Sequence, residues 1–179
     1  LRRILNKHKQ YPDTDWALRK DELSPFEQLY SQLYPKDVLV RNVWLFNEDH
    51  RTQMIDPASA TPFEVDEYKE IEEQVAARRE RAVAELVKEL TLDRVLELRL
   101  EVKYPWYLGE ALAKVIKDEQ DLQSVWLCLE DDAPHIAFAH GFFSQKLRCE
   151  EFCWLQTLAQ ELLKEGYSDR AVANALVPV

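Results

Sequence analysis

Apolar residues recur at helical spacing along most of the chain, and prolines, capping residues and short polar segments separate the helices that they predict. Most of these helices are 10 to 16 residues long, and two to five residues connect the later ones. No run of alternating polar and apolar residues indicates a hairpin of strands. The expected helices are residues 1–10, 24–34, 38–46, 65–90, 91–102, 105–116, 121–129 (or from 118), 134–147, 152–163 and 168–176.

Helix starts are marked most clearly in the first half of the chain by Ser24-Pro25-Phe26-Glu27. Serine can cap a helix, proline suits its first position, and a glutamate three residues after the cap completes a capping box. This helix has its apolar stripe at Phe26, Leu29, Tyr30 and Leu33, and Pro35 ends it. Asp37 caps the next helix, which is rich in β-branched residues but has no candidate strand to pair with.

Capping residues also separate the predicted helices in the second half of the chain. Thr91 begins one helix and Pro105 begins another. Gly166, in a left-handed backbone conformation, is expected to end the helix that starts at residue 152. Ser168 caps a last short helix, in which Val172, Ala173 and Leu176 are expected to face inward. The longest helix, residues 65–90, is acidic in its first turns and then basic, which suits its dipole.

These helices predict an all-α fold. Because short connections make consecutive helices antiparallel, we expect helical hairpins stacked as an imperfect array of the HEAT or TPR type. A single globular helical bundle is the alternative. We expect one domain, residues 1–179, in which an irregular loop at 47–64 separates a smaller helical part (1–46) from the main array (65–179).

Charge narrows the class of partner. The 179 residues are 46% apolar and 31% charged, with a formal net charge of −10, yet residues 1–20 carry six basic and two acidic groups. An acidic chain repels a phosphate backbone, which argues against nucleic acid as a partner. No apolar run has the roughly 18 to 20 residues that span a bilayer, so we expect no membrane partner.

The cysteines indicate the cellular compartment, and the chain ends indicate whether the sequence is part of a longer protein. The three cysteines, Cys128, Cys149 and Cys153, are odd in number, which favours free buried thiols in a cytoplasmic protein. The chain begins at Leu1 rather than methionine and stops at Val179. We interpret it as a segment of a longer protein.

Candidate chemistry is sparse. The glycines Gly109, Gly141 and Gly166 are isolated, so they form no phosphate-binding loop, and the first two favour close packing of helices. His135 and His140 lie five residues apart, about 140° around a helix, whereas a shared metal needs one face. We therefore predict no catalytic residue, no cofactor and no metal.

The remaining candidates are contact residues. His140 lies in an apolar run and is either a ligand contact or, as we favour, a core residue hydrogen-bonded to a carbonyl of a neighbouring helix. Trp16 lies in a connecting segment and is the best candidate among the five tryptophans for an exposed contact. Arg78 and Arg79, on the longest helix, complete the expected partner contacts.

Three segments resemble helical-array regions inside large multidomain bacterial proteins of uncharacterised function. They are residues 11–18 (YPDTDWAL), 43–46 (VWLF) and 104–112 (YPWYLGEAL). The resemblance implies a cytoplasmic array within a longer protein and implies no catalytic residue.

The sequence thus favours a non-catalytic scaffold or protein-interaction module. Its partner would be another protein or other domains of the parent chain, and uncapped ends of the array could self-associate. The alternatives are a small enzyme that uses carboxylates in a groove of a helical bundle and a purely architectural spacer.

Overall fold

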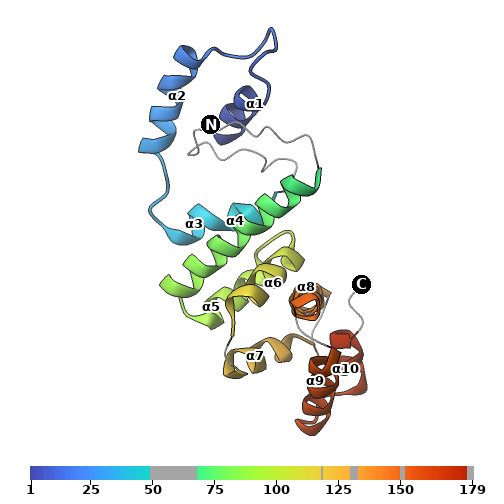
Figure 1. Ribbon diagram of the computed structural model, residues 1–179. Helices are drawn as coiled ribbons and strands as arrows, with labels where there is room; N and C mark the ends of the chain where they lie inside the picture. Colours follow the sequence, from blue (N-terminus) through green and yellow to red (C-terminus); the bar gives the residue numbers. More distant parts are fainter. Residues whose placement is uncertain (49–67, 118, 130–132, 150–151, 177–179) are drawn as a thin grey trace. The chain divides into compact units, whose positions relative to one another are not determined.

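Helices make up most of the described structure. The computed structural model describes residues 1–48, 68–117, 119–129, 133–149 and 152–176. Of these residues 78% are helical and none is in a strand, so the all-α prediction is confirmed. In chain order the elements are α1 (Arg2–Gln10), α2 (Lys20–Gln32), α3 (Val38–Asn42), the 3-10 turn η1 (Val43–Phe46), α4 (Tyr68–Glu89), α5 (Leu92–Glu97), η3 (Leu98–Leu100), α6 (Pro105–Val115), α7 (Glu119–Trp126), η4 (Leu127–Leu129), α8 (Ala133–Cys149), α9 (Phe152–Lys164) and α10 (Asp169–Leu176) (Figure 1).

The chain divides into two compact units, Leu1–Ala77 and Arg78–Val179, and the division falls within α4. We call them the N-terminal unit and the C-terminal unit. The irregular loop expected at 47–64 lies outside the described residues from position 49 onward. The first residues of the long helix expected at 65–90 also lie outside them, and its described part forms α4.

In the N-terminal unit, α2 starts earlier than the expected cap at Ser24. It begins at Lys20, four residues before Ser24, because the Glu22 carboxylate accepts a hydrogen bond from the Arg19 backbone N–H (2.9 Å) and satisfies that end of the helix. Pro25 therefore lies inside α2, where it removes the N–H that would donate to the Asp21 carbonyl.

The residues that follow α2 form helix, as expected. The Asp37 side chain accepts hydrogen bonds from the backbone N–H groups of Leu39 (2.8 Å) and Val40 (3.0 Å). This cap starts α3, which continues into η1, so the choice of helix over strand for 38–46 is confirmed.

Two ion pairs anchor α1 within its unit. The Arg2 guanidinium stacks over the Trp44 ring at 3.4 Å and pairs with Glu48 at 2.5 Å. Lys9 pairs with Glu27 of α2 at 2.7 Å. These contacts hold both ends of α1, so the loop that follows it starts from a fixed position.

In the C-terminal unit, the closest pair of helices is α6 and α8. A Cβ built on Gly109 would overlap the Phe138 carbonyl oxygen and lie 2.8 Å from the Phe142 nitrogen. A Cβ on Gly141 would overlap the Trp106 carbonyl oxygen. The packing role expected for these two glycines is confirmed, since each admits the backbone of the facing helix.

Several predicted caps of this unit are confirmed as well. Thr91 Oγ1 accepts from the Arg94 N–H (3.4 Å), and Pro105 is the first residue of α6. Gly166 has φ +86°, and the Tyr167 N–H reaches back to the Leu162 carbonyl (3.0 Å), which closes α9. Ser168 Oγ accepts from the Ala171 N–H (3.2 Å) at the start of α10.

The inward face expected for α10 is wrong for Ala173 and only partly right for Val172, and the side chain of the third expected residue, Leu176, lies outside the description. Ala171 and Ala175 are fully buried, whereas Ala173 is exposed and Val172 is half-buried. Asn174 also turns toward the unit, because its amide donates to the Leu129 carbonyl (2.9 Å). Small alanines let α10 lie close to its neighbours, and the larger valine lies at the edge.

Candidate functional site

The exposed apolar side chains are concentrated in the N-terminal unit. Nine of the eleven large apolar residues that are exposed within the described ranges lie between positions 1 and 40. The other two, Leu100 and Leu163, belong to the C-terminal unit. The candidate site is therefore a surface of the N-terminal unit, and it has two parts.

The first part is the exposed face of α2, which we call the α2 ridge. It consists of Phe26, Leu29 and Tyr30 in the helix, together with Leu33 and Tyr34, which follow its last residue, Gln32. Phe26, Leu29, Tyr30 and Leu33 have the i, i+3, i+4 and i+7 spacing of one helix face. Four of the five side chains are exposed, and Leu33 reaches 65%. The Tyr30 and Tyr34 rings meet edge to face with centroids 5.9 Å apart.

The α2 ridge corrects the expected core face of this helix. The sequence places Phe26, Leu29, Tyr30 and Leu33 on the apolar stripe, but Phe26, Leu29 and Leu33 are exposed and the buried residue of α2 is Leu23. Tyr30 is half-buried and marks the edge of the ridge. The spacing of the apolar residues therefore predicts where the stripe lies on the helix, but it does not predict that the stripe faces solvent.

The second part is an aromatic corner where the chain leaves α1, formed by Lys7, His8, Tyr11 and Trp16. Trp16 is 46% exposed, which confirms it as an exposed residue. Its ring meets those of His8 and Tyr11 edge-on, with centroid distances of 5.6 Å and 5.9 Å. The Lys7 ammonium lies 4.7 Å from the Trp16 centroid, within the range of a cation–π contact.

Local hydrogen bonds shape this corner. The Thr14 hydroxyl donates to the Tyr11 carbonyl (2.8 Å), and the Ala17 N–H donates to the Thr14 carbonyl (2.9 Å). The Leu18 N–H then donates to His8 Nδ1 (3.1 Å), which returns the loop to α1. An acceptor Nδ1 carries no proton, so neutral His8 has its proton on Nε2.

Arg78 and Arg79 are placed differently from each other. The Arg79 side chain is 6% exposed, and its guanidinium stacks on the Tyr107 ring at 3.6 Å inside the C-terminal unit. The guanidinium therefore packs α4 against α6, and little of the Arg79 side chain is accessible to a partner. Arg78 is half-buried.

His140 lies on α8 and is half-buried. Within the described part of the chain its Nε2 is buried and has no hydrogen-bond partner, so the carbonyl bond that the sequence favoured is not formed by this nitrogen. Ser144, one turn later, has a buried hydroxyl in the same condition. Burial lowers the pKa of His140 because the charged imidazolium loses its hydration.

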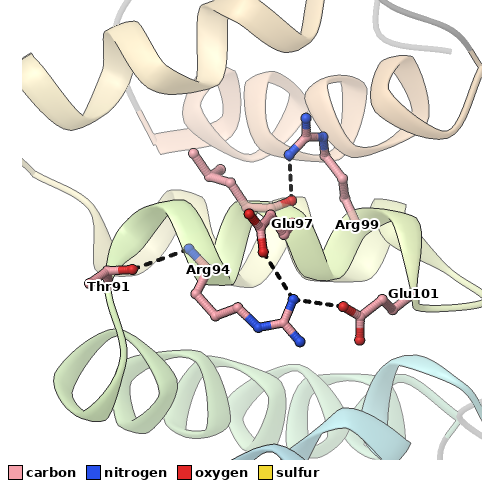
Figure 2. A network of polar contacts seen from close by, with 6 residues as sticks. Thr91, Arg94, Glu97, Arg99 and Glu101 are labelled. Atoms are coloured by element: carbon pink, nitrogen blue, oxygen red, sulfur yellow. Dashed lines mark hydrogen bonds and ion pairs between the residues drawn. The ribbon is translucent and has the colours of Figure 1, made fainter.

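A network of polar contacts lies along α5 and η3. The Arg94 guanidinium pairs with Glu97 (3.0 Å) and with Glu101 (2.7 Å), and Thr91 caps the same helix (Figure 2). The hydrogen bonds that Arg94 donates to Glu101 and, next in size, to Glu97 raise the pKa of Arg94. Both carboxylates are largely exposed and bound to a cation, an arrangement that stabilises their ionised form rather than preparing an acid.

Metal and thiol chemistry find no support in the described residues. No group of three or more His, Cys, Asp or Glu side chains there is placed to hold a metal ion. Cys128 is buried, as expected for a thiol used as a small apolar residue. The side chains of Cys149, Cys153 and His135 lie outside the description.

Comparisons with protein-family models, curated proteins and solved structures give no match to this chain. None of the described helices combines the length and the apolar character needed to cross a membrane.

Proposed function

We propose that the chain is a non-catalytic protein-interaction module and that the α2 ridge is its docking surface. The observation that supports this is the exposure of a helical stripe of large apolar side chains in the N-terminal unit. Scattered exposed leucines are ordinary on protein surfaces, but a contiguous row on one helix face is typical of an interface.

The spacing of the ridge defines the kind of partner. Phe26, Leu29 and Leu33 follow the i, i+3, i+7 pattern by which one amphipathic helix packs along another. Full burial of a Leu or Phe side chain contributes about 1.5 to 3 kcal/mol. A partner helix that covers this row would therefore gain several kcal/mol before the entropy of association is subtracted.

The helical array also belongs to this proposal. Short connections and the side-by-side packing of consecutive α9 and α10 support stacked hairpins of the HEAT or TPR type. The pairing of α6 with α8, across α7, is a departure from that simple succession. In this arrangement the partner is a protein or another domain of a longer parent chain.

Fewer observations support the alternative of an enzyme that uses carboxylates in a groove. Its clearest carboxylate pair, Glu97 and Glu101, is exposed and shares Arg94. The pKa of Glu22, at the start of α2, is lowered by the hydrogen bond from the Arg19 backbone N–H, whereas a general acid needs a raised pKa.

Site-specific photo-crosslinking in living cells tests the module. A photoreactive phenylalanine analogue replaces Leu29 in the ridge and, as a matched control, Leu163, which is an exposed leucine on α9. We expect a discrete adduct of defined mass at position 29, lost when Leu33→Glu is added, and none at position 163. Absence of any protein adduct at 29, or equal adducts at both positions, would contradict the proposal.

A further inference from the structure

The inward face of α2 is less apolar than its outward face. Leu23 is buried, and Glu27 and Tyr30, four and seven positions later on the same face, are half-buried. This inward row therefore contains one aliphatic side chain, one carboxylate and one phenol, whereas Phe26 and Leu29 of the outward row stay exposed. Because burial of apolar area is the main force that holds a helix on its neighbours, α2 is docked by its weaker face.

A polar contact supplements the burial of Leu23. Lys9 of α1 pairs with Glu27 at 2.7 Å, and the side chain of Glu27 is 39% exposed. Ion pairs that are open to water stabilise little, because water and salt compete for both partners. The docking of α2 therefore depends mainly on Leu23 and on the half-buried ring of Tyr30.

An undocked α2 has little to keep it helical. It has 13 residues, a length at which isolated helices are marginal in water. Pro25, inside the helix, lacks the N–H that would donate to the Asp21 carbonyl, and proline is the least favourable residue in a helix interior. When α2 undocks it should therefore lose its helix, and with it the spacing that forms the α2 ridge.

The segment that contains α2 has defined ends. Before it, the Leu18 N–H donates to His8 Nδ1 (3.1 Å), which ties the chain to α1. After it, Asp37 caps α3 through the backbone N–H groups of that helix, and Val38 is buried. Residues 19–36 can therefore open locally while α1 and α3 keep their own contacts.

We propose that α2 is a conditional helix: residues 19–36 open and lose their helix as one unit while α1, α3 and the C-terminal unit stay folded, and the α2 ridge exists only in the closed state. This opening is a property of the free chain and goes beyond the proposed function. Its regulatory consequence rests on that function, because a partner that binds the ridge binds the closed state alone and shifts the population toward it.

Hydrogen exchange of the free chain and its variants tests the opening. Leu23→Ala removes the buried side chain that docks α2, so the α2 amides should exchange at least about tenfold faster, with those of α1 and α8 unchanged. Leu29→Ala removes the same atoms from the exposed row and should change α2 exchange by no more than about twofold. Pro25→Ala restores the missing N–H on the exposed side of the helix, so α2 exchange should slow by about tenfold.

Each outcome decides the question. If Leu23→Ala speeds exchange in α1 or α8 as much as in α2, then α2 does not open separately and the inference is overturned. It is also overturned if Pro25→Ala leaves α2 exchange unchanged, and this variant adds helix stability, so misfolding does not obscure its result.

The crosslinking experiment at position 29 reads out partner binding and not opening, so the two proposals can fail separately. Separate opening of α2 without a protein adduct would leave the conditional helix and remove the interaction module. An adduct at position 29 on a chain whose α2 opens only with global unfolding would do the reverse.

Discussion

At the scale of single residues, two buried polar atoms on one face of α8 stand out. His140 Nε2 and the Ser144 hydroxyl lie one helical turn apart, and both lack a hydrogen-bond partner within the described residues. Leaving such a group buried without a partner costs about 1 to 3 kcal/mol. The apolar run around His140 signals its burial, but hydrogen bonding depends on neighbouring backbone, which one sequence does not reveal.

His140 gives the protein a pH dependence of known sign. Burial lowers its pKa in the folded state, so as the pH falls below about 6.5 the unfolded chain takes up the proton first and unfolding becomes easier. His140→Gln removes this titration. We expect urea unfolding midpoints of the original chain to fall more steeply between pH 7.5 and 5.5, about one unit on either side of that value, than those of the variant. Parallel curves for the two proteins would contradict the burial of this imidazole.

Trp16 shows where sequence reasoning succeeds at this scale. Its position in a short segment between two helices indicates exposure, because a loop residue has few elements to pack against. The structure adds what the sequence could not, since the rings of His8 and Tyr11 fix the orientation of the indole. Those contacts follow from the return of the loop to α1 through the Leu18 N–H.

At the scale of elements, the sequence predicts features that depend on neighbouring residues, such as helix caps, but not features that depend on tertiary packing. The caps at Asp37, Thr91 and Ser168 were predicted because a side-chain oxygen and a backbone N–H two or three residues later decide them. Ser24-Pro25 has the same local signature, yet Glu22 begins the helix earlier. The exposed face of α2 depends on what packs against it, and periodicity alone does not contain that information.

The α6–α8 pair depends on its two glycines. In an isolated helix Gly109→Ala would gain about 1 kcal/mol, but here the new Cβ would overlap the Phe138 carbonyl oxygen, which is backbone and cannot turn aside. We expect overpacking to dominate and to lower the free energy of unfolding by about 2 kcal/mol net. Urea denaturation followed by circular dichroism measures it.

Gly166 provides the matched comparison for that measurement. A Cβ there meets nothing within 4 Å, so Gly166→Ala costs only the strain of its positive φ, about 1 kcal/mol. A Gly109→Ala protein that is as stable as the original, or more stable, would show that α6 and α8 do not approach as closely as the structure places them.

At the scale of the whole molecule, burial and exposure are divided unevenly. Of the thirty buried apolar residues in the described ranges, 24 lie in the C-terminal unit, which includes Phe138, Phe142 and Phe143 in α8. The N-terminal unit holds six and carries nearly all the exposed large apolar side chains. Hydrophobic stabilisation scales with the apolar area that is buried, so the two units should differ in stability.

Hydrogen exchange measures that difference segment by segment. We expect the backbone amides of α6 and α8 to exchange most slowly, near the rate set by global unfolding, and those of α2 to exchange much faster through local opening. Protection of α2 equal to that of α8 in dilute solution would contradict the uneven division.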